Sequence, residues 1–247
     1  MTSRIEIVLD LPRSSPHLGA AEAFWAAALG WPLGDPWPGY PELATFTPPT
    51  GDPYVHRQLV DGPGGVHLDL EVPELDAATA RLTGLGAELV RRTADWQTLT
   101  SPGGLDFCVV RELTGPRPAP VSGPAGLRRR LVQLCLDVPP PHVDAELAFW
   151  RAALPWRAQE IDAPEFLLRL VPPPGAPAQL LLQRLGEDDG GVSTRAHLDL
   201  GSDDHVADAD LLVDLGAVRL HTGDGFVALR DPAGFAFCVT AHSPDRP

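Results

Sequence analysis

The sequence predicts an α+β protein made of two similar domains in tandem, each composed of two strand–helix–strand–strand–strand modules. Three observations support this fold class. The chain repeats itself over most of its length, and a stretch rich in Pro and Gly separates the two copies. Within each copy, segments with a two-residue apolar period alternate with segments that have apolar residues at helical spacing. These features together favour duplicated domains with mixed secondary structure.

The repeat is the strongest of the three observations. The motif His67–Leu70 returns as His197–Leu200, 130 residues later (197 − 67). Other matched pairs are Leu85–Ala87 with Leu215–Ala217, Phe107–Val109 with Phe237–Val239 and, at a smaller offset of 125 (148 − 23), Ala23–Trp25 with Ala148–Trp150. A repeat of this length indicates a duplicated domain, since solenoid units are roughly 20–50 residues long.

In the first copy, each element follows from its own local pattern. Residues 4–11 alternate between apolar and polar side chains, which predicts a half-buried strand. The Ala-rich residues 18–29 have helical spacing and end at Gly30, a typical helix stop. The further elements predicted are strands at 43–47, 54–60 and 66–72, a helix at 75–85 closed by Gly86, and strands at 87–92, 95–100 and 105–111.

The second copy repeats this order. Its predicted elements are strand 131–138, helix 142–154, strands 155–161, 165–171 and 178–184, strand 194–200, helix 204–215, and strands 217–221, 225–230 and 234–240. The segment between the copies is rich in Pro and Gly and is expected to cross a surface without packing as an element. We therefore expect one domain at 1–113, a linker at 114–128 and a second domain at 129–243.

The charge of the chain argues against nucleic acid as a partner. Nineteen basic residues, all of them Arg, stand against 33 acidic residues, which gives a net charge of −14. Phosphate binding needs clustered basic side chains. The one dense run, Arg128–Arg130, is expected to be a solvated strand edge, with a phosphate site as the alternative.

Composition also predicts the compartment. No apolar stretch approaches the roughly 20 residues that span a bilayer, and the N-terminus has no apolar signal region. Cys108, Cys135 and Cys238 are too few for a disulfide framework. We expect a reduced cytoplasmic protein with a small-molecule partner and no membrane partner, either as a monomer with paired domains or as a homodimer.

An ordered set of motifs occurs in both copies. It consists of Phe24-Trp25 before Leu29-Gly30-Trp31, then His67–Leu70, then Leu85–Ala87, then Phe107-Cys108, each with its counterpart in the second copy. This set covers nearly the whole chain and resembles the glyoxalase-like branch of the glyoxalase/bleomycin-resistance/dioxygenase (vicinal oxygen chelate) superfamily. The resemblance implies paired βαβββ modules that form an open curled sheet around a cleft. It also implies either metal-dependent catalysis or metal-free ligand binding, and the fold alone does not choose between them.

The resemblance further implies where metal ligands would lie. Metal-using relatives take ligands from the first and last strands of their modules. The matching first-strand positions are Glu6, His67, Gln133 and His197, which form the metal set that the resemblance implies. Cys108 and Cys238 occupy the last-strand position where the metal enzymes usually have Glu. The remaining positions fall near residues 56–58 and on Gln183.

The strand period places these residues on a common face. His67 shares its side of the strand with Asp69 and Glu71, opposite the aliphatic residues. Each domain is therefore predicted to have a pocket lined by a His, an acid or amide, and a Cys. For His67 and His197, three roles stay open: a structural hydrogen bond between strands, ligand contact or acid–base catalysis without metal, and metal ligation. Asp69 and Asp199 either orient these histidines or cap a strand end.

Aromatic residues supply the last candidates. Trp37, Tyr54 and Trp96 occur only in the first copy and are predicted to stack on a ligand. The paired residues Trp25 and Trp150 are expected in the core.

Three hypotheses about function follow. The leading one is a protein that binds a small, partly aromatic or apolar molecule, for sequestration, resistance or metal-free catalysis, with no metal favoured. The alternative is a lyase or isomerase that depends on a divalent metal (Zn, Fe, Mn or Ni) and acts on vicinal oxygens. In the third, one copy is degenerate and purely structural, as the pairs Glu6/Gln133 and Ser101/Asp231 suggest.

Overall fold

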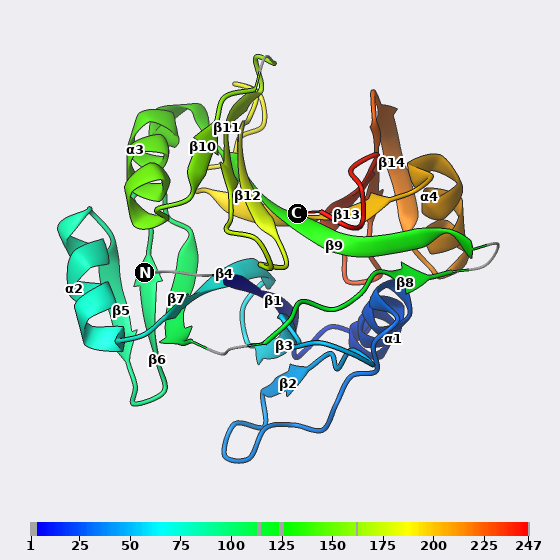
Figure 1. The fold of residues 1–247 in the computed structure, drawn as a ribbon, viewed down its shortest axis with the longest axis horizontal. Coiled ribbons are helices and arrows are strands. Elements are labelled where there is room, and N and C mark those ends of the chain that lie inside the picture. Colours follow the sequence, from blue (N-terminus) through cyan, green and yellow to red (C-terminus); the bar gives the residue numbers. More distant parts are fainter. Residues whose placement is uncertain (1–3, 113–114, 124–125, 162, 247) are drawn as a thin grey trace. The chain divides into compact units, whose positions relative to one another are not determined.

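The computed structural model describes residues 4–112, 115–123, 126–161 and 163–246. Across these residues the chain forms two sheets and four α-helices, arranged as four βαβββ modules (Figure 1). The predicted α+β class, with two βαβββ modules in each copy, is confirmed.

The first copy of the repeat forms one sheet. Its elements are β1 (Ile5–Pro12), α1 (Leu18–Leu29), β2 (Leu43–Thr45), β3 (Val55–Val60), β4 (Gly65–Val72), α2 (Leu75–Gly84), β5 (Glu88–Arg92), β6 (Trp96–Thr100) and β7 (Asp106–Arg111). The strand order is β2-β3-β1-β4-β7-β6-β5, so the first strands of the two modules are neighbours at the centre.

The second copy forms the other sheet in the same way. Its elements are β9 (Arg128–Val138), a 3₁₀ turn η2 (Pro140–His142), α3 (Val143–Ala153), β10 (Arg157–Gln159), β11 (Phe166–Val171), β12 (Gln179–Arg184), β13 (Arg195–Ser202), α4 (His205–Asp214), β14 (Val218–Gly223), β15 (Phe226–Arg230) and β16 (Ala236–Thr240). Its sheet also includes β8 (Val121–Ser122), from the segment between the copies. The order is β10-β11-β12-β9-β13-β16-β15-β14, with β8 paired to β9.

The compact units of the chain do not follow the two copies. Unit 1 contains the described residues of 4–7, 67–112 and 134–196, and unit 2 contains those of 8–66, 115–133 and 197–246. Each unit therefore joins one module of the first copy to one module of the second. The domain bounds predicted at 113/114 and 128/129 stay a prediction.

Aromatic packing explains why modules from different copies pair. In unit 2, Trp25 of α1 packs edge-on against Phe237 of β16, with ring centroids 5.2 Å apart. In unit 1, Trp150 of α3 packs in the same way against Phe107 of β7, at 5.3 Å. All four rings are almost fully buried. The core position predicted for Trp25 and Trp150 is confirmed.

Each of these tryptophans donates its indole N–H to a buried carboxylate. Trp25 Nε1 donates to Asp231 Oδ2 at 2.7 Å, whereas Trp150 Nε1 donates to Glu146 Oε2 at 2.6 Å. The residue matching Asp231 in the first copy is Ser101, so unit 1 takes its carboxylate from the helix and unit 2 takes it from a loop. Glu146 therefore supplies in unit 1 the carboxylate that Asp231 supplies in unit 2. The Ser101/Asp231 difference is for this reason no evidence that one copy is degenerate.

Asp231 also predicts an effect of pH on stability. Burial raises the pKa of Asp231 above 3.8, although the bond from Trp25 opposes this. Because the folded protein holds this proton more tightly than the unfolded chain, the contribution of Asp231 is greatest below pH 3.8 and is lost as pH rises through the folded pKa. We expect the melting temperature of Asp231→Asn, measured relative to that of the wild type, to increase as pH rises.

The control for this prediction has the opposite sign. Hydrogen bonds from Arg128 lower the pKa of the exposed Asp203, so its contribution is present above pH 3.8 and is lost as pH falls through the folded pKa. Asp203→Asn should therefore lose melting temperature relative to wild type as pH rises. Melting curves of both variants between about pH 3 and pH 7 test this, and parallel profiles for the two variants would contradict it.

Two sequence expectations about irregular or charged segments were wrong. The segment between the copies contains a packed strand, β8, in which Val121 pairs with Arg129 and also lies against Gly30. In the run Arg128–Arg130, which was expected to be solvated, Arg129 and Arg130 are buried, whereas Arg128 is partly exposed. Arg129 pairs with Asp208 at 2.5 Å, and Arg130 Nε donates to Pro244 O at 2.7 Å. Both guanidinium groups therefore have polar partners within unit 2.

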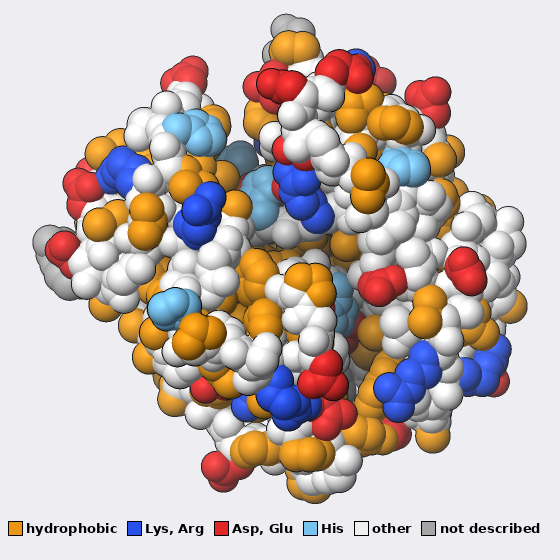
Figure 2. Space-filling model, turned by 180° about the vertical axis from the view of Figure 1, so that it is seen from behind, with side chains coloured by type: hydrophobic (Ala, Val, Ile, Leu, Met, Phe, Trp, Pro, Cys, Tyr) orange, Lys and Arg blue, Asp and Glu red, His pale blue; other side chains and the backbone are white. Residues whose placement is uncertain are grey.

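Charged and apolar side chains are mixed on the surface. On the face that Figure 2 shows, arginine side chains lie in separate small groups among acidic and apolar ones. None of the helices in the described part of the chain is long and apolar enough to span a bilayer.

Candidate functional site

The candidate site of unit 1 is built on three adjacent strands. β4 and β7 run parallel, and their register places Asp69 opposite Cys108. β6 runs antiparallel to β7, and Thr98 faces Cys108 from the other side. Because side chains alternate along a strand, His67 and Asp69 project from the same side of β4, while Leu68 and Leu70 are fully buried on the other side.

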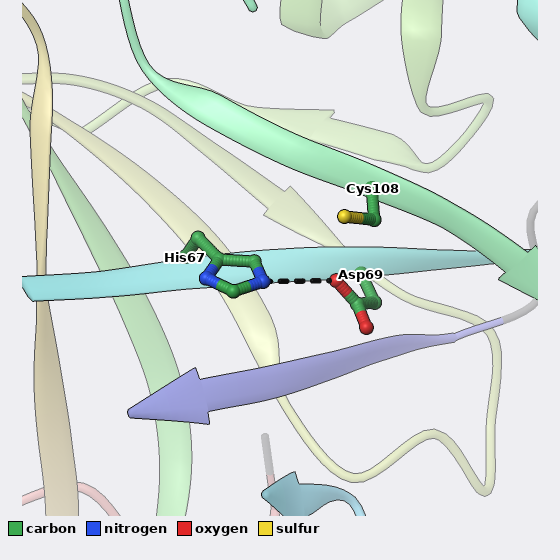
Figure 3. Close-up of side chains that lie close together, drawn as sticks. All are labelled: His67, Asp69 and Cys108. Carbon is green, nitrogen blue, oxygen red and sulfur yellow. Dashed lines mark ion pairs between the residues drawn. The ribbon is translucent and has the colours of Figure 1, made fainter. Parts of the chain in front are cut away.

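The three polar side chains converge. Donor atoms of His67, Asp69 and Cys108 all lie within 4.8 Å of one another. His67 Nε2 is 3.4 Å from Asp69 Oδ1, and the Cys108 thiol is directed toward both (Figure 3). The hydroxyl of Thr98 is 3.5 Å from Cys108 Sγ. Asp69 Oδ1 is buried and accepts no hydrogen bond from the described residues.

Unit 2 contains the same arrangement at the matching positions. His197, Asp199 and Cys238 bring their donor atoms within 4.8 Å of one another. His197 Nε2 is 3.5 Å from Asp199 Oδ1, and Asp199 pairs with Cys238 in the parallel β13–β16 register. Asp199 Oδ1 is likewise buried and accepts no hydrogen bond from the part of the chain that the structure describes. The cluster is therefore a duplicated feature of the fold.

The first strand of each copy distinguishes the two clusters. In unit 2, the amide Nε2 of Gln133 donates to Asp199 Oδ2. The matching residue in unit 1 is Glu6, which is buried 4.0 Å from Arg4. A carboxylate thus replaces a neutral amide in the first copy.

The two units also differ in a second charged feature besides Glu6 and Gln133. Arg4 pairs with the fully buried Glu71 at 2.9 Å in unit 1. At the matching positions, unit 2 has Leu131 and Gly201. A Cβ on Gly201 would lie 2.8 Å from His242 O, so unit 2 has no room for the carboxylate. Unit 2 therefore lacks both members of the ion pair. This is expected, because burial of either charge without its partner would cost free energy.

The environment of Cys108 argues against a nucleophilic role for the free thiol. Burial raises the pKa of Cys108, and the neighbouring Asp69 raises it further, while the hydrogen bond with His67 acts in the opposite direction. Catalytic thiols need a lowered pKa because the thiolate is the nucleophile. A raised pKa therefore does not suit covalent catalysis by the Cys108 thiol.

The other predicted residues lie apart from the clusters or at their margins. Trp37 is 36% exposed, donates to Thr45 Oγ1 at 2.9 Å and packs edge-on against His56. Tyr54 is fully buried against Trp31, and its hydroxyl donates to Leu131 O at 2.6 Å. Tyr54 thus contacts other protein residues, and the ligand-stacking roles of Trp37 and Tyr54 stay predictions.

Trp96 and Gln183 belong to unit 1. Trp96 is half-buried on the same side of β6 as Thr98, two residues away. Gln183 lies on β12 and accepts a long hydrogen bond, 3.6 Å, from Cys135 Sγ. Their predicted contact with a ligand also stays a prediction.

Sequence reasoning left some members of the clusters out. The metal set implied by the resemblance comprised Glu6, His67, Gln133 and His197, whereas the structure brings an Asp and a Cys to each His. The two-residue spacing did place Asp69 on the face of His67, where it was expected to orient the His or to cap the strand end, but it was not included in the metal set. Thr98 and the Arg4–Glu71 pair were not singled out, because their roles depend on strand register.

The Glu6/Gln133 difference predicts unequal affinity for a divalent cation at the two clusters. We expect Glu6→Gln, in a His197→Ala background, to weaken cation binding by about tenfold, because a carboxylate on β1, the strand beside β4, is lost. Gln133→Glu, in a His67→Ala background, should strengthen binding to a similar degree. Calorimetric titration of both variants measures this, and equal affinities before and after each change would contradict it.

Comparison with known proteins places this geometry in a family. The glyoxalase-like domain family matches residues 6–110 and again residues 133–240. The chain therefore belongs to the glyoxalase-like domain family, with two copies in tandem. No curated protein sequence matches the chain.

Solved structures show the same fold at low sequence identity. The Mn(II)-bound glyoxalase from Novosphingobium aromaticivorans has a TM-score of 0.64 at 16% identity, over 98% of this chain and 82% of that one. A variant of 4-hydroxymandelate synthase from Streptomyces coelicolor has a TM-score of 0.63 at 14% identity, over 98% and 94%. Homoprotocatechuate 2,3-dioxygenase from Arthrobacter globiformis has a TM-score of 0.59 at 15% identity, over 100% and 82%.

Proposed function

We propose that the protein is a divalent-metal-dependent enzyme that binds its substrate through two neighbouring oxygen atoms. The observation that carries this proposal is the His–Asp–Cys cluster, which occurs at matching strand positions in both copies. The similar structures include a glyoxalase with bound Mn(II) and enzymes named as dioxygenases, which supports metal chemistry on this fold. Of the first two hypotheses drawn from the sequence, these observations favour the metal-dependent alternative over metal-free binding.

The residues present fit a metal ion. Around a tetrahedral ion with bonds of about 2.0 Å to nitrogen and 2.3 Å to sulfur, ligand atoms are roughly 3.3–3.8 Å apart. The donor atoms of each cluster already lie within 4.8 Å of one another. The buried oxygens Asp69 Oδ1 and Asp199 Oδ1 accept no hydrogen bond in the described structure, so a cation would satisfy them. When bound, such an ion polarises a substrate carbonyl or lowers the pKa of a bound water.

The residues of the chain supply orientation and exclusion of water. In each cluster the Asp lies 3.4–3.5 Å from the His Nε2 on the same strand, which limits how the imidazole can turn. The Gln133 amide fixes Asp199 through its second oxygen. Behind each cluster, fully buried Leu residues of β4 and β13 keep water from the back of the sheet. Rigid strands thus hold the polar groups in place.

Thermal-shift titration with Zn, Fe, Mn, Ni and Mg tests this proposal first. We expect clear stabilisation by at least one ion, reversed by a chelator. The loaded protein should then convert a member of a panel of catechols, 2-hydroxy acids and 2-hydroxy ketones, and a His67→Ala/His197→Ala variant should not. A protein indifferent to every ion, or turnover unaffected by chelation, would overturn the proposal.

A metal-free binding protein for a small aromatic or apolar molecule is the second candidate. The observation that favours it is the partly exposed indole of Trp37, which packs edge-on against His56 at 5.5 Å and donates to Thr45. A ligand that stacks there would change tryptophan fluorescence, and Trp37→Phe should reduce the response. A fluorescence response that persists in a chelated, metal-free protein would favour this candidate over the first.

The remaining expectations extend the same proposal. We propose a small molecule as the partner, with neither nucleic acid nor membrane, in a cytoplasmic protein that is a monomer or a homodimer. The net charge of −14 supports the first exclusion. Whether the reaction is a lyase, isomerase or oxygenation step depends on the substrate that the panel identifies.

A further inference from the structure

We propose that Cys108 and Cys238 are metal ligands as thiolates, so that both clusters select thiophilic ions of the Zn(II) type over Mn(II) and Mg(II). This inference rests on the proposed metal function and adds the identity of the third donor and the metal class that follows from it. It concerns the Cys that each cluster takes from the last strand of its module, β7 or β16.

The strand register places both thiols among the other donors. Asp69 pairs with Cys108 across β4–β7, and Asp199 pairs with Cys238 across β13–β16, so each Cys shares a row with the Asp of its own cluster. Each Sγ lies within 4.8 Å of donor atoms from both the His and the Asp. The thiol position is therefore conserved between the two copies even where Glu6 and Gln133 differ.

A buried Cys is often only a small apolar residue, but the surroundings here are polar. The flanking residues Phe107 and Val109 are fully buried on the aliphatic side of β7. Cys108 points to the opposite side, where it contacts His67, Asp69 and the Thr98 hydroxyl. A residue that served only to fill the core would be expected on the side of Phe107.

The donor set determines which ions suit the site. Imidazole with thiolate favours Zn(II), Co(II) and similar ions, whereas carboxylate and carbonyl oxygens suit Mg(II) and Mn(II). Ligation requires the thiolate, so binding breaks the S–H bond, forms the metal–sulfur bond and releases the proton to solvent. No oxidation or reduction accompanies this step.

Cobalt(II) provides a direct readout of a thiolate ligand. The full-length protein loaded with Co(II) should show a near-ultraviolet absorption band from thiolate-to-cobalt charge transfer. Cys108→Ser and Cys238→Ser should each remove about half of the band, and the double variant should remove all of it, because each site has one thiol in the row beside its Asp. In a Cys135→Ser background, which removes the third Cys, the Cys108 and Cys238 variants should have the same effects on the band.

Replacement of the thiols by carboxylates tests the selectivity. We expect the Cys108→Asp/Cys238→Asp variant to lower the ratio of Zn(II) to Mn(II) affinity by roughly 10- to 100-fold, because the softest donor is lost. Melting curves establish which variants fold. If the double variant does not fold, the single variants and the wild-type absorption spectrum decide.

The outcomes separate this inference from the proposed function. Co(II) that binds tightly without a charge-transfer band, or a band lost only with Cys135→Ser, would overturn the thiolate assignment while leaving a metal enzyme. Wild-type protein that binds neither Co(II) nor Zn(II) would overturn both.

Discussion

Replacement of both His67 and His197 by Ala is expected to abolish stoichiometric metal binding while leaving the fold intact. Each of the two substitutions removes the imidazole of one His–Asp–Cys cluster, and the remaining Asp and Cys cannot complete a metal site. Loss of an outer partner of a metal ligand already costs roughly 10- to 100-fold in affinity, so loss of a ligand should cost more. Calorimetric titration with Zn(II), together with melting curves of the metal-free proteins, measures both effects.

The control is a histidine outside the clusters. His17 is exposed before α1, and its side chain caps no helix N–H, so His17→Ala should leave metal affinity unchanged. If His67 and His197 were only structural links between strands, their loss would instead lower the melting temperature and leave ion binding as it was. That result would contradict the metal account.

Glu146→Ala is expected to lower the free energy of unfolding by about 2–6 kcal/mol, because two buried donors each lose an acceptor at roughly 1–3 kcal/mol. Glu146 accepts from the Trp150 indole at 2.6 Å and from the Gly103 N–H at 2.5 Å, and its side chain is fully buried. Chemical denaturation at neutral pH measures the change. Asp144→Ala, at an exposed position on the same helix, is the control and should change stability by no more than about 1 kcal/mol.

Unit 2 suggests a substitution that would restore part of the stability lost in Glu146→Ala. Asp231 occupies the position matching Ser101, and both accept from the N–H four residues later, at 2.9 Å from Phe235 and 3.1 Å from Leu105. Adding Ser101→Asp to Glu146→Ala would place a carboxylate where unit 2 has one for Trp25. We expect part of the stability to return. A double variant that is less stable than Glu146→Ala would show that the two units do not share this design.

The elements were predictable because each is encoded by a local pattern. The Ala-rich stretch ended by Gly30 predicted a helix at 18–29, and α1 has these bounds. Gly30 has a φ of +67°, the left-handed conformation that makes Gly an effective helix stop. The strands were found to within a few residues because their apolar residues alternate.

Features that depend on distant partners were not predictable. β8 forms because Val121 and Ser122 pair with β9, and nothing in a Pro- and Gly-rich sequence signals that pairing. Arg129 is buried because Asp208, 79 residues away, neutralises it. The sequence shows the charge of each residue, whereas burial depends on a partner that only the fold brings near.

The same distinction holds for the site. The spacing His67–Asp69 placed both side chains on one face, since side chains alternate along a strand. The approach of Cys108 required the register of β4 with β7, and the bond from Gln133 to Asp199 required that of β9 with β13. These registers depend on the whole sheet, so the third donor of each cluster was assigned a ligand-binding role without its partners being known.

The most direct test of the account is the metal content of the protein purified without a metal-affinity tag, measured by elemental mass spectrometry. We predict one to two equivalents of a thiophilic divalent ion such as zinc for each chain, in accordance with the two His–Asp–Cys clusters. Protein that contains no metal and takes up none from a Zn(II) solution would contradict the central claim that these clusters are metal sites.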